Sequence, residues 1–297
     1  MSIPMIIKKP IKQILAGLGL KKYRYPYKEG FIEVNDKYSR GNVKLYWRPD
    51  SFMETEIFKF GLYGEWEKQS LEIWAQLSMI SSQIVDIGAN TGIYSIVAKK
   101  NNHKAQVVAI EPIQTNFEIL AKNVEANALQ IITVQAAVSN YEGTSKMFVL
   151  KDRLNYMTAL NDNRYNRHPE HAKNIPVIEM IVQVDTLENI ARNSGLDKID
   201  LIKIDVEGHE LVLFESIGDY LKINLPSVLV EIISDDAAQG INKIIGNFGY
   251  YILAMNERDT KCKLVNEVWN NQHHNFLLCN EKHFLHLKKL NLIEIEN

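Results

Sequence analysis

The stretch from Ile84 to Gly92, with the sequence IVDIGANTG, constrains the fold more than any other part of the chain. Its β-branched apolar residues suit a fully buried strand, and Asp86 interrupts them just before Gly88. The glycines tolerate positive φ in the tight turn that follows, and asparagine is one of the few other residues that does so. An apolar helical run begins directly after Gly92. A strand, a glycine turn and a helix in this order predict a nucleotide pocket faced by backbone N–H groups.

The spacing of the turn indicates which nucleotide it takes. A dinucleotide site uses G-x-G-x-x-G, in which the second glycine lets a pyrophosphate approach bare backbone. Here the pattern is D-x-G-x-N-x-G, with Asn90 in the place of that glycine and Asp86 adding a negative charge. We therefore predict S-adenosyl-L-methionine as the cofactor, since it carries a sulfonium and an ammonium and no phosphate. A buried turn without ligand is the alternative, and the spacing disfavours an NAD-dependent oxidoreductase.

Composition and charge set the class of protein. With 297 residues and 46% hydrophobic content, the chain is expected to form one large α/β domain with an appendage. A formal charge of −2 lacks the strongly basic balance of a protein with an extended nucleic-acid surface. The two cysteines, without a secretory leader, favour reduced thiols and a cytoplasmic location. No apolar run reaches membrane-spanning length, and the pattern does not indicate the oligomeric state.

The N-terminal part is expected to be a cap over residues 1–60, ahead of the domain that carries the cofactor pocket, over residues 61–297. Its first residues place apolar side chains on one helical face with lysines around it. Such a helix packs on its own domain or makes a weak contact with a membrane surface. The pattern then becomes short and extended up to Phe60, and Gly64-Glu65-Trp66-Glu67 opens a helix that runs to about Leu77.

The ends of the next two strands supply further cofactor residues. A strand over 106–110 ends in Glu111, about 20 residues beyond the glycine turn, where an acid accepts hydrogen bonds from ribose hydroxyls. A third strand over 131–137 ends in small residues, of which Ala137 is expected to border the adenine ring.

The segment 151–175 has little apolar periodicity and lies between two predicted strands, 144–150 and 177–184. A structureless span of this length inside a compact domain is usually functional or disordered. We predict a substrate lid, with Arg164, Arg167 and His168 as candidate substrate-binding residues. A surface loop with solvated charges is the alternative.

Ionised residues interrupt the apolar strand pattern within the stretch IDLIKIDVEGHE, residues 199–210. Alternation places Lys203 and Asp205 on one face, and such charges are costly in a central parallel strand unless they are paired. Open α/β sheets bind ligands at the carboxyl ends of their strands. We therefore predict Asp205 and Glu207 as catalytic carboxylates and Lys203 as a substrate-binding residue that offsets their charge. A purely structural ion pair is the alternative.

Two further candidates lie close to this strand. His209 follows it directly and is a weaker candidate base, because a neutral imidazole works near pH 7. The next strand, 228–233, contains Glu231, a candidate substrate-binding residue. Segments 249–254 and 275–279 are expected to close the sheet as an antiparallel pair.

Several motifs together resemble the FkbM-type family of S-adenosylmethionine-dependent methyltransferases. The resemblance runs from about Gly61 to Cys279 and is carried by VDIGANTGIYS, IEPIQTNFEILAKNVEAN, QAAVS, VDTLENI and IDLIKIDVEGHE. It implies a class I methyltransferase (Rossmann-like) fold, with a seven-stranded, mostly parallel sheet and helices on both faces. It also implies O-methylation of a hydroxyl on a sugar, glycan or polyketide-like metabolite.

The resemblance assigns roles by position. The turn residues would line the methionine and ribose end of the cofactor, Glu111 would hold the ribose, and Asp205 would lie beside the reacting methyl group. The turn residues are Asp86, Gly88, Asn90 and Gly92. The small-molecule or glycan acceptor itself is left open.

Three alternatives stay open. A nucleic-acid or protein N-methyltransferase would use the same cofactor, but the Asn/Asp-Pro-Pro-aromatic motif typical of many such enzymes is absent where this chain has DVEG. A binding module without catalysis would keep the pocket alone. No spacing dedicated to a metal is found and no metal is expected, although Asp205, Glu207 and Asp235 offer oxygen ligands for a divalent ion.

Overall fold

The computed structural model describes residues 28–39, 41–49, 51–150, 158–159, 177–270 and 275–295. The predicted N-terminal helix lies outside the described residues, as does the predicted lid apart from residues 158–159, so the lid residues Arg164, Arg167 and His168 do too. Among the described residues, no helix has both the length and the apolar character needed to span a bilayer.

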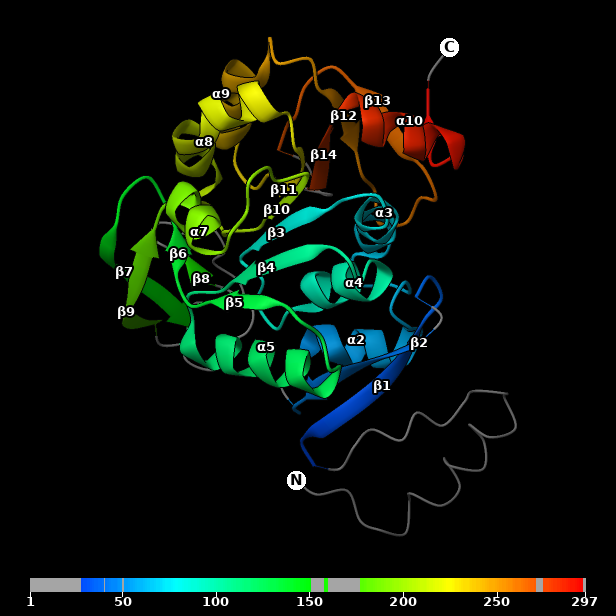
Figure 1. Ribbon diagram of the computed structural model, residues 1–297, viewed down its shortest axis with the longest axis vertical. Coiled ribbons are helices and arrows are strands. Elements are labelled where there is room, and N and C mark those ends of the chain that lie inside the picture. The colour runs from blue at the N-terminus through cyan, green and yellow to red at the C-terminus, as the bar shows by residue number, and fades with distance from the viewer. Residues whose placement is uncertain are drawn as a thin grey trace, which may run out of the picture.

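The described part of the central sheet has nine strands in the order β15-β13-β12-β14-β11-β10-β3-β4-β5. Figure 1 shows them running through the middle of the molecule. Their bounds are β3 (Gln83–Ile87), β4 (Gln106–Ile110), β5 (Ile132–Val134), β10 (Leu201–Ile204), β11 (Ser227–Glu231), β12 (Tyr251–Ala254), β13 (Cys262–Val265), β14 (Asn275–Cys279) and β15 (Ile293–Glu294).

The predicted α/β class with a mostly parallel sheet is confirmed. Strands β5, β4, β3, β10 and β11 are parallel neighbours, and β14 pairs antiparallel with both β11 and β12 as expected. The sheet has nine described strands in place of the seven expected, because β13 and β15 extend the edge beyond β12. These two strands have only four and two residues and carry little apolar alternation.

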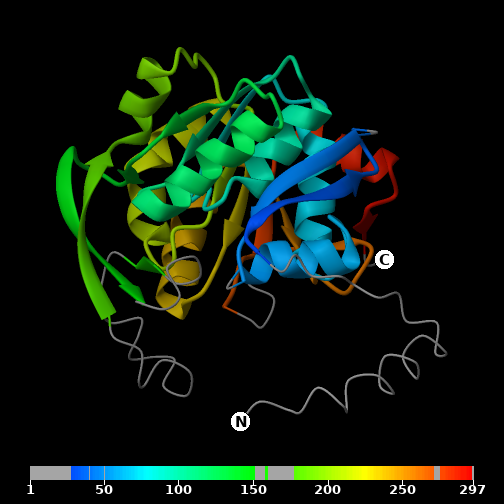
Figure 2. The same ribbon diagram turned by 90° about the horizontal axis from the view of Figure 1, so that it is seen from below.

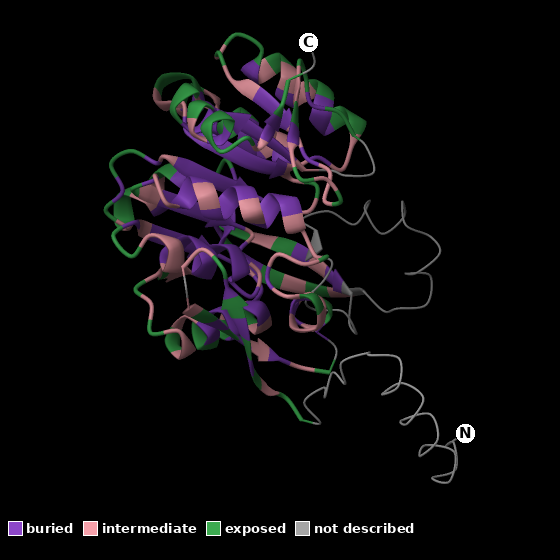
Figure 3. Cartoon of the chain, turned by 90° about the vertical axis from the view of Figure 1, so that its right-hand side faces the viewer, coloured by how far each residue is buried: buried purple, intermediate pink, exposed green. Residues whose placement is uncertain are grey.

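Helices cover both faces of the sheet because side chains alternate along each buried strand. The face that carries Ile84 packs against α3 (Lys68–Ser78), α4 (Ile93–Asn101), α5 (Gln114–Ala126) and α10 (Glu281–Lys289). The face that carries Val85 packs against α7 (Leu187–Asn193), α8 (Glu210–Asn224) and α9 (Asp235–Ile245). Figure 3 colours most residues of the strands between these two layers as buried.

A second, four-stranded sheet flanks the first, in the order β6-β9-β7-β8. It contains β6 (Ala137–Val138), β7 (Gly143–Leu150), β8 (Thr158–Ala159) and β9 (Val177–Asp185). The predicted strands at 144–150 and 177–184 are therefore confirmed. The predicted third strand, 131–137, is divided instead, because β5 ends at Val134 and Ala137 pairs with Val184 of the second sheet.

The N-terminal part forms the hairpin of β1 (Gly30–Asp36) and β2 (Gly41–Trp47), followed by helix α2 (Phe52–Phe60). The expectation of extended structure up to Phe60 is wrong for α2, whose buried residues Glu54 and Ile57 are spaced as on one helical face. The hairpin lies beside α5 (Figure 2), where Asn123 Oδ1 accepts a hydrogen bond from the backbone N–H of Tyr46 at 2.6 Å. The hairpin shares the hydrophobic core of the sheet; the boundary expected at residue 60 stays a prediction.

A buried histidine joins three elements behind the sheet. His283 Nδ1 lies 2.8 Å from Ser227 Oγ at the start of β11, and its Nε2 lies 3.2 Å from Ser81 Oγ after α3. The side chain is fully buried, and burial, assisted by the nearby charge of Lys282, lowers the pKa of His283 to about 4.

This histidine makes stability depend on pH. Its folded pKa lies below the unfolded value of 6.5, so the unfolded chain binds the proton more tightly and stability falls as the pH drops below about 6.5. Between pH 7.5 and pH 5 we expect the wild type to lose about 2 kcal/mol more unfolding free energy than the variant His283→Gln. Urea unfolding at both pH values measures this. His103→Gln, at an exposed position, should keep the wild-type dependence, and equal pH dependence in His283→Gln would contradict the assignment.

Candidate active site

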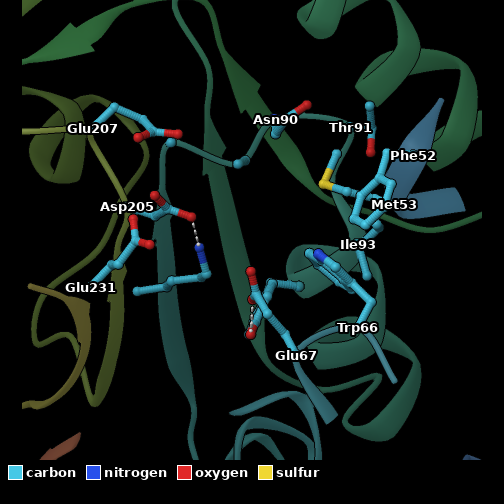
Figure 4. Close-up of a pocket in the computed structure, with 14 residues that line it drawn as sticks. Phe52, Met53, Trp66, Glu67, Asn90, Thr91, Ile93, Asp205, Glu207 and Glu231 are labelled. Atoms are coloured by element: carbon cyan, nitrogen blue, oxygen red, sulfur yellow. Dashed lines mark hydrogen bonds and ion pairs between the residues drawn. The ribbon is translucent and has the colours of Figure 1, made fainter. Parts of the chain in front are cut away.

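A pocket of about 180 Å³ opens at the carboxyl ends of β3, β10 and β11 (Figure 4). Side chains from α2, from the start of α3, from the glycine turn and from the ends of β10 and β11 form its walls. The lining residues are Phe52, Met53, Trp66, Glu67, Gly88, Ala89, Asn90, Thr91, Ile93, Tyr94, Lys203, Asp205, Glu207 and Glu231.

The glycine turn has the left-handed backbone that its sequence predicts. The φ values are 77° at Gly88, 52° at Asn90 and 87° at Gly92. A Cβ atom on Gly88 would lie 1.8 Å from the carbonyl oxygen of Asp205, so only glycine lets the turn rest against the end of β10. The turn and the acidic strand end therefore form one wall of the pocket.

Helix α2 supports this turn from outside the predicted domain. Thr91 Oγ1 donates a hydrogen bond to Glu54 Oε1 at 2.7 Å, and Asn123 Nδ2 donates one to the carbonyl oxygen of Thr91 at 2.8 Å. Glu54 is buried, and burial raises the pKa of its carboxyl. The sequence around Glu54 predicts an extended segment, and such a segment gives no sign of the contact that α2 makes with the turn.

Asp86 lies behind the pocket wall and does not line the pocket. It is fully buried, and its Oδ2 accepts a hydrogen bond from Ser95 Oγ at 2.6 Å. Its Oδ1 has no hydrogen-bond partner among the described residues. Asp86 stands opposite Lys203 in the register of β3 and β10. Burial raises the pKa of Asp86, and the charge of Lys203 opposes this rise.

Glu111 holds the other side of the turn, next to β4. Its Oε2 accepts a hydrogen bond from the backbone N–H of Asn90 at 2.9 Å, and its Oε1 accepts one from Ile113 N–H at 2.9 Å. Burial raises the pKa of Glu111 to about 7. Neither Glu111 nor the buried Ala137 lines the pocket, so their predicted contacts with ribose and adenine stay predictions.

Lys203 lies at the centre of the charged residues in the pocket. Its Nζ is 2.8 Å from Asp205 Oδ2 and 4.5 Å from the centre of the Tyr94 ring, and the residue is only 6% exposed. Burial alone would lower the pKa of Lys203, but the charges of Asp205, Glu67 and Asp86 outweigh burial and raise it. The ion pair expected between Lys203 and Asp205 is therefore present.

Glu67 and Trp66 line the opposite wall, and neither was predicted from the sequence to have a role in the site. Glu67 Oε2 accepts a hydrogen bond from the Tyr94 hydroxyl at 2.5 Å. Burial raises the pKa of Glu67 to about 7, against the opposing charge of Lys203. The only signal in the sequence was an acid at a predicted helix start, and such acids usually stabilise the helix itself.

Asp205, Glu207 and Glu231 converge from the ends of β10 and β11. One carboxylate oxygen of each lies within 4.8 Å of the others, a grouping that suits a divalent cation as well as a hydroxyl acceptor. The structure thus places Glu231, and not Asp235, beside Asp205 and Glu207. Asp235 instead lies in the first turn of α9.

His209 is separated from these carboxylates. It precedes α8, its Nε2 lies 2.9 Å from Ser139 Oγ, and it does not line the pocket. Burial lowers the pKa of His209. This placement favours the carboxylates over His209 as the base.

The residues present fit S-adenosylmethionine. The pocket has four carboxylates on its walls and Asp86 behind it, against the one cation Lys203 among the lining residues. A buried cation needs such partners, whereas a pyrophosphate would be repelled by them.

Comparisons with known proteins identify the family that the chain resembles. The family model of the methyltransferase FkbM domain matches residues 86–260, more than half of the chain. Methyltransferase sdnD of Sordaria araneosa is 25% identical over 156 residues, which cover 46% of this chain and 60% of the relative. Methyltransferase 1 of Beauveria bassiana (strain ARSEF 2860) is 22% identical over 160 residues, covering 51% and 64%. The match thus spans less than two thirds of the length of both relatives.

Solved structures resemble the chain at low identity. Methyltransferase FkbM from Methylobacillus flagellatus KT is 14% identical, with a TM-score of 0.39, over 66% of this chain and 43% of that one. TrmK of M. capricolum, in complex with S-adenosyl-homocysteine, is 17% identical, with a TM-score of 0.35, over 70% and 66%. The match of the family model confirms the resemblance read from the motifs, and with it the predicted cofactor. The chain belongs to the FkbM family of S-adenosylmethionine-dependent methyltransferases.

Proposed function

We propose that this chain methylates a hydroxyl oxygen of a small sugar, glycan or polyketide-like molecule. One observation carries the proposal: Asp205, Glu207 and Glu231 converge beside the glycine turn, where a methyl donor is expected. Carboxylates accept hydrogen bonds from hydroxyl groups, and an ionised carboxylate also accepts the proton that a hydroxyl must lose.

The apolar wall supports a small, uncharged acceptor. Phe52 and Trp66 line the pocket opposite the carboxylates, and Phe52 is 56% exposed (Figure 4). Aromatic faces pack on the apolar faces of sugar and polyketide rings. Of the residues that line the pocket, only Lys203 carries a positive charge, and it is paired with Asp205. A phosphate-rich nucleic acid therefore suits this pocket poorly.

The chain's own residues would orient and deprotonate the acceptor. When bound, the cofactor supplies a methyl group on a positively charged sulfur. The acceptor oxygen forms the new C–O bond as the C–S bond breaks, and the electron pair of that bond goes to sulfur. The hydroxyl proton passes to Glu207, while Asp205, held by Lys203 at 2.8 Å, orients the reacting groups. Orientation and a base within reach each contribute orders of magnitude to the rate.

Glu207 is the preferred base because its backbone is held in an unusual conformation at the site. Its φ is 57°, in the turn directly after β10. A left-handed non-glycine residue costs about 1–3 kcal/mol and persists where the surroundings impose it, often at functional sites.

The remaining expectations about the protein's surroundings stay proposals. These are the cytoplasmic location, the absence of an extended nucleic-acid surface and a weak membrane contact through the N-terminal residues. Identifying the acceptor would distinguish the proposal from its two alternatives. An N-methyltransferase would methylate a nitrogen, and a binding module without catalysis would methylate nothing.

An acceptor screen tests the proposed reaction. With S-adenosylmethionine carrying a deuterated methyl group, we expect the label on a hydroxyl oxygen within a panel of sugars, nucleotide sugars and polyketide-like alcohols. Mass spectrometry detects the label, and fragmentation locates it. Label on RNA or on a protein amine would instead support the N-methyltransferase alternative.

Replacing the proposed base should lower turnover with little effect on cofactor affinity. For Glu207→Gln we expect kcat to fall about 10²- to 10⁴-fold, the usual contribution of a general base. The affinity for S-adenosylhomocysteine, measured by calorimetry, should stay within about twofold. Glu215→Gln, at an exposed position on α8, is the matched control. Unchanged kcat in Glu207→Gln would reject this residue as the base.

Chelation tests the role of the three carboxylates. We expect turnover to persist in EDTA, because Lys203 already supplies a positive charge at Asp205. If EDTA abolishes turnover and Mg²⁺ restores it, the carboxylates hold a cation and the acceptor is activated by the metal.

A further inference from the structure

The side chain of Glu67 does not cap the helix that follows it. Glu67 is the N-cap residue of α3, but its side chain makes no capping hydrogen bond. Glu257, on the loop after β12, caps α3 instead. Its Oε2 accepts hydrogen bonds from the backbone N–H groups of Gln69 at 2.7 Å and Ser70 at 3.2 Å. A carboxylate from a distant part of the chain therefore caps α3, and the Glu67 side chain is turned into the pocket (Figure 4).

The backbone and neighbours of Glu67 hold this orientation. Its φ of 39° and ψ of 42° are left-handed, which is costly for a residue with a side chain. Its carboxylate accepts a hydrogen bond from the Tyr94 hydroxyl at 2.5 Å. Tyr94 is fixed in turn by Trp74, whose ring centre lies 5.6 Å away and whose Nε1 donates to the Tyr94 carbonyl oxygen at 2.9 Å. The carboxylate of Glu67 is thus preorganised toward the pocket.

The size of the pocket indicates which part of the cofactor it takes. Its volume of about 180 Å³ is below the roughly 300–1,000 Å³ of a site that holds a complete small ligand. The ribose is expected at Glu111, which follows β4 on the far side of β3 from β10. A cofactor whose ribose is bound there would extend across the glycine turn, and its amino-acid end would then reach the pocket beside Glu67.

The charges in the pocket match the amino-acid end of the cofactor. An α-amino acid carries an ammonium and a carboxylate, and each needs a partner of opposite charge when water is removed. Lys203 offers the positive partner, and Asp205 is already engaged with Lys203 at 2.8 Å. Glu67 has its carboxylate bonded to the neutral hydroxyl of Tyr94, and its second oxygen is a remaining acceptor for an ammonium.

We propose that Glu67 binds the α-ammonium of the amino-acid end of S-adenosylmethionine, with Tyr94 fixing the carboxylate. Glu67 is then a cofactor-binding residue that lies outside the stretch matched by the family model. The proposal rests on the cofactor of the proposed function and is independent of the acceptor.

Two ligands that differ only in this end test the proposal. S-adenosylhomocysteine has the α-ammonium, whereas 5′-methylthioadenosine lacks the whole amino-acid part. For Glu67→Gln, calorimetry should show about 10- to 100-fold weaker binding of S-adenosylhomocysteine, as expected for a lost charge-assisted hydrogen bond. The affinity for 5′-methylthioadenosine should stay within about twofold. Glu67→Asp, which keeps the charge, should recover part of the loss.

Glu65→Gln is the matched control, because Glu65 is exposed two residues away on the same segment and does not line the pocket. It should bind both ligands as the wild type does. Unchanged affinity of Glu67→Gln for S-adenosylhomocysteine would overturn the proposal. So would an equal loss for both ligands with a lowered melting temperature, which would make Glu67 a structural residue. No acceptor is present in these measurements, so a failed acceptor screen does not affect their outcome.

Discussion

The buried ammonium of Lys203 is the interaction on which the pocket depends. Lys203 lies in the middle of the sheet, where an isolated charge costs several kcal/mol even after relaxation. Asp205 at 2.8 Å, Asp86 across the strand pair and the face of Tyr94 offset this cost. The dependence is mutual, because Asp86 and Asp205 would repel each other without the cation. Removing Lys203 alone would therefore raise the pKa of Asp86 and of Glu67, because its charge now opposes the rise that burial causes in both.

The glycine turn is held at three points, each by a different part of the chain. Gly88 rests against the carbonyl oxygen of Asp205, Asn90 donates its N–H to Glu111, and Thr91 bonds to Glu54 of α2. A turn fixed in this way keeps its shape before a ligand arrives. Less binding energy is then spent on ordering the protein.

The parts of the site that sequence reasoning found have local signals. Glycine spacing predicted the turn, and charges within an apolar strand predicted the pair of Lys203 and Asp205. Glu67 and Glu54 lack such a signal, since their roles follow from tertiary contacts with Tyr94 and Thr91. The capping of α3 by Glu257 also lacks a local signal, because Glu257 is 188 residues from Gln69 in the sequence. For the fold, the apolar patterns of the sequence predicted the long strands. The short edge strands β13 and β15 have too few residues to show such a pattern.

The N-terminal part completes the pocket that the family domain begins. The family model starts at Asp86 and includes the glycine turn and the ends of β10 and β11. The wall formed by Phe52, Met53 and Trp66 precedes it. This wall is anchored, because Glu54 on the same helix bonds to Thr91 and the hairpin before it shares the core of the sheet. The pocket walls thus come from two stretches of sequence, and only one of them lies within the family match. A substitution in α2 can therefore alter the apolar wall while the charged strand ends keep their residues.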